Sequence, residues 1–529
     1  MLVCPCVIPT HTERRYGDDV RQICGALQDF GAFCRYHVAI PAPLSNPQSV
    51  PSSTRGLTFS QLTAGLLFGA LAVCALLMPA QSDTYWHLRA GQEIWRTLHV
   101  PLSDHYSYTA TGRFWPNHEW LWEAFSYALY RAGGMRLFVV GGAAFAMGAL
   151  AIVYRLMVGT TATKFVLMLL GFPLTSVIWV LRPQIVTLFM LVTLVWLLVE
   201  ERHWPLPIVF VIWANAHGGV SVGGLLLAAI TVVAVVRARR GDATDVRRAV
   251  RLCVVAPLCA LATALTPLGF QVWHFVGGSL ALSRKNGITE WQLTLPTGPF
   301  EIIFWILAAA FVGLLIWRRG RLREASWRWG DTVILTAALL TLPLGFLMVR
   351  NTAMFLLVAI PAASRLLGPD FRFRRAAFAV ESEEHPKLNL LLLVGITLVE
   401  VAGVLIIWRA PPPRSGWEPM SAGAIAAVRS CPERIYNRFY DGGFLIWFVP
   451  ERQVFIDNRQ DPYPSAFIRE TTAVDSGAPY RAMFDRYGIR CAFVPAESKM
   501  IERLEADHWT NRFHDKKWAV LTAPVPGVD

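Results

Sequence analysis

The chain has 529 residues, with 49 lysines and arginines against 37 aspartates and glutamates, which gives a formal net charge of +12. Hydrophobic residues make up 54% of it and charged residues only 16%, whereas soluble domains carry about one quarter charged residues. This composition excludes an ordinary soluble protein and predicts one that crosses a membrane several times.

Residues 1–56 have no sustained apolar period and are rich in proline and serine between Pro41 and Ser53. We expect a disordered cytoplasmic tail here. The close pair Cys4 and Cys6 could start a metal site, but no second cysteine pair has the spacing of a zinc knuckle. No cleavable signal is visible, so the first apolar run should act as the membrane anchor.

About eleven apolar runs follow, and together they predict an α-helical polytopic membrane domain over residues 57–409. Several are shorter than the ~20 residues of a straight span, so we expect tilted or re-entrant pieces, above all in the fifth run. The runs cover roughly residues 60–79, 137–154, 165–181, 183–199, 205–216, 218–236, 252–268, 301–317, 331–349, 351–364 and 388–408.

Arginine gathers in three connections between the runs, at residues 237–251, 318–328 and 365–387. By the positive-inside rule these loops face the cytoplasm, so the positive charge needs no nucleic acid as a partner. Counting spans from them puts the amino terminus inside, and the first loop, residues 80–136, outside. The same count puts the part after Trp408 outside.

Residues 410–529 have an ordinary soluble composition and predict a small extracytoplasmic α/β domain. We expect helices near 422–429 and 480–487, and short strands at 434–437, 444–448, 453–457 and 491–495. Cys431 and Cys491 are the two cysteines of this part, and in an oxidising compartment they could pair.

The first outer loop carries most of the candidate chemistry. Asp83 and His87 are four residues apart in a stretch of helical composition, so they share one face. Asp104 and the pair His118-Glu119 follow. A carboxylate here could accept a proton from a substrate hydroxyl, while a second carboxylate or a histidine could hold a divalent cation against a phosphate.

Each of these residues also has a structural interpretation. Asp83 could cap the following helix, and Asp104 could form a turn. His118 and Glu119 could be an interfacial pair among tryptophans, whose rings suit the headgroup layer.

Other polar residues stand at the outer ends of later runs. Arg182 and Arg350 could snorkel to the surface, or could clamp a lipid phosphate with a bidentate fork. His217, which precedes two glycines, breaks a span and is expected to line a cavity. Glu290 could supply a further carboxylate, although we expect it in a surface loop.

These motifs together resemble a group of bacterial polytopic proteins related to the GT-C glycosyltransferase superfamily, over roughly residues 57–520. The matching motifs are Asp83–Leu88, Gly91, Pro101, Asp104, Trp115, His118–Leu121, Arg182–Pro183, Trp213–Gly219, Glu290–Trp291, Arg350–Asn351 and Val454–Arg459. The resemblance implies a large first outer loop, an essential acidic residue after the first span, often a divalent metal, and a polyprenyl-phosphate-linked sugar donor. The chain departs from the best-known branches because no adjacent Asp-Glu pair follows the first span.

The resemblance predicts a glycosyltransferase of the bacterial inner membrane that moves a sugar from a polyprenyl-phosphate-linked donor, a membrane lipid, to an envelope acceptor on the outer face. In this hypothesis Asp83 and Asp104 are catalytic, and Arg182, Arg350 and His217 bind the phosphate. His87, His118 and Glu119 would hold Mg²⁺ or Mn²⁺. The alternative is a non-catalytic transporter, flippase or scaffold for cell-envelope polysaccharide, although we find no internal repeat of the kind that transporters often show.

Overall fold

The computed structural model describes residues 56–176, 179–320, 327–369, 371, 385–409, 417–432 and 434–524. The predicted tail therefore lies outside the described residues, apart from Gly56.

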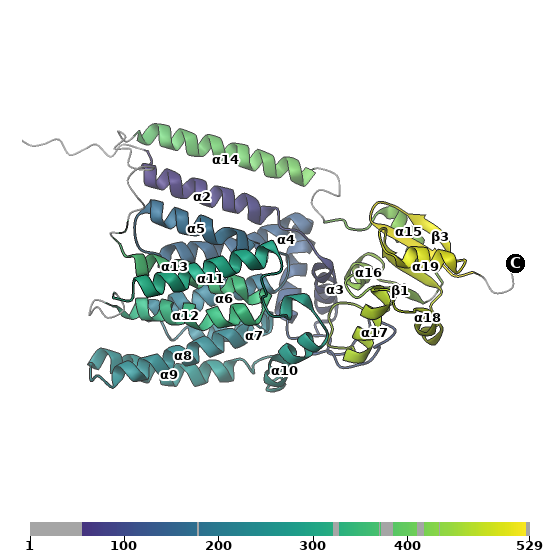
Figure 1. Cartoon of the computed structure of the whole chain (residues 1–529), viewed down its shortest axis with the longest axis horizontal. Coiled ribbons are helices and arrows are strands. Elements are labelled where there is room, and N and C mark those ends of the chain that lie inside the picture. The colour runs from purple at the N-terminus through teal and green to yellow at the C-terminus, as the bar shows by residue number, and fades with distance from the viewer. Residues whose placement is uncertain are drawn as a thin grey trace, which may run out of the picture. The chain divides into compact units, whose positions relative to one another are not determined.

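Helices make up the part of the chain that we expected to be membrane-embedded. They are α2 (Phe59–Leu76), α3 (Ser82–Thr97), α4 (Trp120–Leu156), α5 (Thr161–Ser176), α6 (Gln184–Val199), α7 (Leu206–Ala216), α8 (Val220–Ala238), α9 (Ala243–Ala262), α10 (Gln271–Lys285), α11 (Pro299–Trp317), α12 (Trp329–Leu347), α13 (Thr352–Leu367) and α14 (Pro386–Arg409). Two short 3₁₀ turns, η1 (Thr289–Trp291) and η3 (Val349–Asn351), lie between them. Figure 1 shows α2 beside α14 at one edge of the bundle and α8 beside α9 at another.

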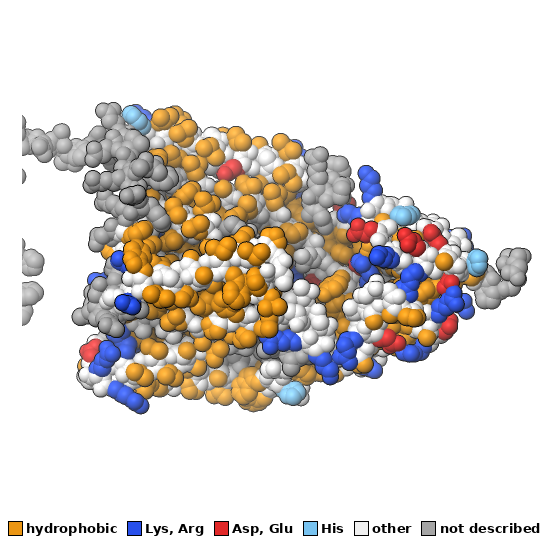
Figure 2. All heavy atoms as spheres, viewed as in Figure 1, with side chains coloured by type: hydrophobic (Ala, Val, Ile, Leu, Met, Phe, Trp, Pro, Cys, Tyr) orange, Lys and Arg blue, Asp and Glu red, His pale blue; other side chains and the backbone are white. Residues whose placement is uncertain are grey.

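Within the described residues, six helices are long and apolar enough to cross a membrane, namely α2, α4, α8, α11, α12 and α14. Helices α6 and α7 and most of α5 are apolar but shorter. Figure 2 shows hydrophobic side chains over the face of the bundle that is in view, and charged side chains over the carboxyl-terminal domain. The predicted polytopic helical class is confirmed, while the number of spans stays a prediction.

The second apolar run is part of a longer helix than we expected. Helix α4 begins at Trp120 rather than near residue 137, and its backbone leaves helical geometry at Gly133 and Gly134. Gly134 has φ of +65°, a conformation that glycine adopts without steric cost. The part of α4 before this break, from Trp120, therefore lies within the predicted outer loop of residues 80–136. Its contacts with α3 bring Glu119, the residue before the helix, next to α3.

The carboxyl-terminal domain is a small mixed sheet with short helices. Its helices are α15 (Ala422–Arg429), α16 (Gly442–Phe448), α17 (Ser465–Asp475), α18 (Arg481–Tyr487) and α19 (Met500–Ala506), and its strands are β1 (Ile435–Asn437), β2 (Cys491–Pro495), β3 (Thr510–His514) and β4 (Trp518–Thr522). The sheet order is β1-β2-β4-β3, with β1 parallel to β2 and the other pairs antiparallel. Cys431 and Cys491 form a disulfide.

Two predicted strands of this domain are wrong. The apolar run 444–448 is inside helix α16, and 453–457 is an extended segment that makes one isolated bridge, between Val454 and Ser107. A short run of consecutive apolar residues fits a buried helix as well as a buried strand, so periodicity could not separate the two.

Helix α16 connects this domain to the helix that carries Asp83. A Cβ added at Gly443 would lie 2.2 Å from the Ser82 carbonyl oxygen, so the two backbones meet where only glycine fits. The Gly443 amide also donates to Ser82 Oγ over 3.1 Å. Phe444 and Phe448 pack on the Tyr85 ring. These contacts fix the start of α3 against the carboxyl-terminal domain.

Candidate functional site

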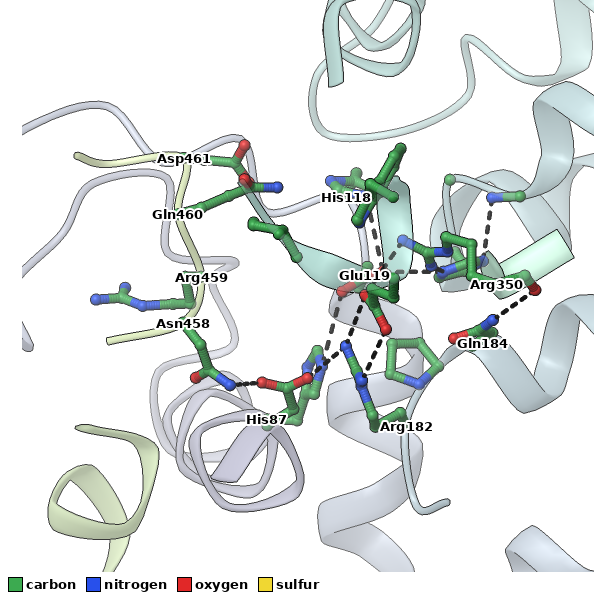
Figure 3. A pocket seen from close by; sticks show the side chains of 18 of the residues that line it. His87, His118, Glu119, Arg182, Gln184, Arg350, Asn458, Arg459, Gln460 and Asp461 are labelled. Carbon is green, nitrogen blue, oxygen red and sulfur yellow. Dashed lines mark hydrogen bonds and ion pairs between the residues drawn. The ribbon is translucent and has the colours of Figure 1, made fainter. Parts of the chain in front are cut away.

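A cavity of about 900 Å³ lies where α3, the ends of several bundle helices and the carboxyl-terminal domain meet. Nearly all the predicted site residues line it: Asp83, His87, His118, Glu119, Arg182, His217 and Arg350. Figure 3 shows Arg182 and Arg350 on one side of Glu119, and Asn458 and Asp461 on the other. Six chain segments far apart in sequence therefore contribute these polar groups to one cavity.

Asp83 does not cap its helix. The cap of α3 is Gln81, which forms a capping box with Thr84, and Asp83 stands in the first turn. Its carboxylate lies 2.5 Å from Arg182 Nη2 and also accepts a hydrogen bond from Asn458. Burial raises the pKa of Asp83 and outweighs the opposing effect of the Arg182 charge. The Asp83 side chain therefore interacts with groups inside the cavity instead of capping α3.

Two arginines and one further carboxylate complete this end of the cavity. Arg182 donates through both terminal nitrogens to Glu290, each over 3.4 Å. Arg350 Nη1 lies 3.7 Å from the same Glu290 carboxylate, and its guanidinium stacks 4.4 Å from the Trp291 ring centre. Neither arginine snorkels away from the protein. Glu290, which we expected in a surface loop, is the group that bridges them.

Glu119 sits among three imidazoles. Its carboxylate oxygens lie 3.7 Å from His87 Nε2, 3.7 Å from His217 Nε2 and 3.8 Å from His118 Nε2. Burial raises the pKa of Glu119 and lowers the pKa of His87 and of His217 well below the ordinary value. The two histidines are therefore neutral at pH 7, and each can accept one hydrogen bond and donate another.

The donor set does not fit the predicted metal. Within the described part of the chain, no group of three or more His, Cys, Asp or Glu side chains is arranged to hold a metal ion. Arg350 Nη2 also lies 3.1 Å from His217 Nε2, so a guanidinium already faces that nitrogen. The metal-binding role of His87, His118 and Glu119 therefore stays a prediction, and no step of the proposed reaction uses Mg²⁺ or Mn²⁺.

Asp104 does not line the cavity. Its carboxylate is fully buried, accepts from the Ser107 hydroxyl over 2.6 Å and forms an ion pair with Arg459. The Arg459 guanidinium also donates twice to Asp457, over 2.7 Å each, and stacks between Tyr106 and Trp115. The predicted catalytic Asp104 is thus placed as an anchor for the loop at residues 457–461.

Arg459→Ala should destabilise the chain strongly, because it leaves the buried carboxylates of Asp104 and Asp457 without a cation. Loss of one partner from a buried pair costs about 3–5 kcal/mol. Thermal unfolding of the purified chain measures this, with Arg490→Ala, an exposed arginine of the same domain, as the control. Equal unfolding temperatures for the two variants would contradict the anchoring role.

The tryptophans of the first loop do not form an exposed belt. Trp115 and Trp122 are buried, and Trp120 donates to Asn215 over 2.6 Å. Sequence reasoning missed the cavity residues Tyr440, Gln460 and Asp461 of the carboxyl-terminal domain, while Asn458 was part of the motif Val454–Arg459. The available signal was the polar run from Asp457 to Asp461 after a buried segment, which is typical of a functional loop.

No protein-family model and no curated protein sequence matches the chain. Similar solved structures include those of three other proteins. Archaeoglobus fulgidus oligosaccharyltransferase AglB, in complex with an inhibitory peptide and a dolichol-phosphate, shares 13% identity over 82% of this chain and 69% of its own, with a TM-score of 0.47. ArnT from Cupriavidus metallidurans, bound to undecaprenyl phosphate, shares 11% over 88% and 98%, with a TM-score of 0.49.

The third, arabinosyltransferase EmbB from Mycobacterium smegmatis, shares 10% identity over 75% of this chain and 42% of its own, with a TM-score of 0.38. All three of these structures have TM-scores below 0.5. At such low identities and TM-scores they say nothing of the chemistry, so the function has to follow from the residues of the cavity.

Proposed function

We propose that the chain is a membrane glycosyltransferase that takes a sugar from a polyprenyl-phosphate-linked donor and transfers it to an envelope acceptor at the outer face. The observation that carries this proposal is the shared cavity, in which Asp83 lies 2.5 Å from Arg182 and Arg182 and Arg350 share Glu290. A transferase needs a carboxylate beside a phosphate-binding group, whereas a scaffold does not.

The two guanidinium groups fit the phosphate of the lipid. Arg182 and Arg350 both line the cavity. A guanidinium can present two parallel N–H donors to phosphate oxygens. When the sugar leaves, the negative charge that grows on the phosphate is stabilised by these fixed cations in a site of low dielectric. Glu290 holds the two arginines together until the phosphate enters.

The cavity also reaches an apolar surface. Its lining includes Val222 and Leu225 of α8 and Met348 beyond α12, and Leu225 is 49% exposed on one of the membrane-crossing helices. A polyprenyl chain can therefore pass from the cavity into the hydrocarbon layer along these apolar side chains, without crossing the part of the cavity that carries the charged groups.

The disulfide supports an outer location for the cavity. Disulfides persist in oxidising compartments and are rare in the cytosol. The Cys431–Cys491 bond belongs to the domain that supplies Asn458 and Asp461 to the cavity. This agrees with the arginine-rich loops, which place the opposite ends of the helices in the cytoplasm.

Ser476→Cys, in the exposed part of the carboxyl-terminal domain, should react with a membrane-impermeant maleimide in intact cells. A cysteine at exposed Arg240, in an arginine-rich loop, should react only after the cells are opened. The reverse pattern would place the cavity in the cytoplasm and contradict the proposal.

Transfer can be tested without knowing the sugar, because membranes of a deletion strain retain the natural donor and acceptor. Adding the purified chain should produce a glycan that mass spectrometry finds neither in untreated membranes nor with the Asp83→Asn variant. A deletion strain with an unchanged glycan profile, and no product on addition, would refute the proposed transfer and favour the scaffold or transporter alternative.

A further inference from the structure

The carboxyl-terminal domain brings its own carboxylate into the cavity, opposite the arginines. Asp461 lines the cavity, and within the described residues no side chain or backbone group donates a hydrogen bond to its carboxylate or forms an ion pair with it. Among the other carboxylates of the cavity, Asp83 and Glu290 are paired with arginine and Asp441 with Arg438, whereas Glu119 has three histidines at 3.7 to 3.8 Å. Asp461 is thus a carboxylate free to meet a ligand.

The loop that carries Asp461 is held firmly on both sides. Arg459 anchors it to Asp457 and Asp104 as described above, and Gln460 donates to Ser283 Oγ of α10 over 2.9 Å. Gln460 also has φ of +53°, a conformation in which non-glycine residues carry strain. A loop this constrained keeps Asp461 at a fixed place in the cavity.

A second atom of the same loop also lacks a partner. The Asn458 amide nitrogen donates to Asp83, and the amide oxygen is buried without any hydrogen-bond partner. A buried polar atom without a partner is costly, so a ligand that supplies the donor is favoured. The unpartnered groups of the loop are two acceptors, the Asp461 carboxylate and the Asn458 amide oxygen, and one donor, Arg459 Nη1. A hydroxyl-bearing acceptor fits them, because a hydroxyl both donates and accepts hydrogen bonds.

We infer that the loop at residues 457–461 forms the acceptor subsite, and that Asp461 is the catalytic base which takes the proton of the acceptor hydroxyl. This rests on the proposed transfer function. As the acceptor oxygen forms its bond to the anomeric carbon of the sugar, its proton passes to the Asp461 carboxylate. The bond from that carbon to the phosphate oxygen breaks, and the polyprenyl phosphate leaves with the electron pair beside Arg182 and Arg350.

Asp83 then has a different part in the same reaction. Its carboxylate pairs with Arg182 and accepts a hydrogen bond from Asn458. It therefore fixes the position of the phosphate-binding arginine relative to the acceptor loop. Asp461 has the properties of the base. Burial raises its pKa to about 6, with Glu119 acting in the same direction and His118 and Arg459 opposing. A base with a pKa just below neutral pH is ionised in the cell yet still binds a proton well.

The test compares Asp461→Asn, Asp461→Glu and Asp485→Asn in the add-back assay on deletion-strain membranes. Asp485 is an exposed aspartate of the same domain and serves as the matched control. Asp461→Asn should lower kcat by about 10²- to 10⁴-fold, the contribution of general base catalysis. It should also remove the rise of the wild-type rate with pH around 6, because only the ionised carboxylate accepts the proton. Asp461→Glu should restore part of the rate and the rise.

Binding of undecaprenyl phosphate separates the outcomes. Asp461→Asn should bind this lipid as the wild type does, since the phosphate end of the cavity is untouched. Wild-type kcat and an unchanged pH profile in Asp461→Asn would overturn the assignment of the base while leaving the transfer function standing. Absence of product from the wild type itself would overturn both.

Discussion

Arg182→Ala should lower kcat/KM for sugar transfer by at least about 10²-fold, because it removes a donor aimed at the developing phosphate charge. The same change should weaken binding of undecaprenyl phosphate about 10- to 100-fold, the value of a hydrogen bond to a charged group. Arg182 is also the cation between Asp83 and Glu290. Its loss leaves two carboxylates facing an incoming anion, which adds repulsion to the missing attraction.

Two variants sharpen this result. Arg182→Lys keeps the charge but loses the fork, so binding should fall less than in Arg182→Ala, while transfer stays impaired. Arg113→Ala removes an exposed arginine of the first outer loop and should leave both quantities unchanged. Lipid binding by Arg182→Ala at the wild-type level would show that the phosphate sits elsewhere.

Asp83→Asn should lower the transfer rate by about 10²-fold or more and leave lipid binding equal or tighter. The amide keeps the size of the side chain but removes the negative charge that fixes Arg182. A freed guanidinium can still bind phosphate, but its position beside the sugar is no longer set, and small misplacements of catalytic groups cost large factors in rate.

Glu93→Gln is the control for this change, because Glu93 lies on the same helix α3 and does not line the cavity. Transfer by Glu93→Gln should match the wild type in membranes supplied with donor. Full transfer by Asp83→Asn would instead remove Asp83 from the reaction altogether.

The helical, polytopic class could be predicted from the sequence because apolar runs of this length are typical of membrane-spanning helices. The position of α4 could not, since the residues from Trp120 to Met135 include charged and aromatic side chains that pack on α3 instead of facing lipid. The same held for α16, whose run of consecutive apolar residues fits a buried helix as well as a buried strand.

The grouping of Asp83, Arg182, His217 and Arg350 followed from orientation alone, since the arginine-rich loops put all four at one membrane face. The hydrogen-bond and ion-pair partners of each residue could not be predicted from this orientation. The choice between Asp83 and Asp104 depended on Arg459, which lies some 355 residues after Asp104 and binds it in the interior. Asp461 was missed because its importance comes from having no partner, a property that only the folded chain has.

The most direct measurement is a structure of the full chain with undecaprenyl phosphate. The account predicts the phosphate between the guanidinium groups of Arg182 and Arg350, the isoprenoid chain leaving past Leu225 of α8, and Asp461 across open space from the phosphate. A headgroup bound outside this cavity, with Arg182 and Arg350 still paired to Glu290, would contradict it.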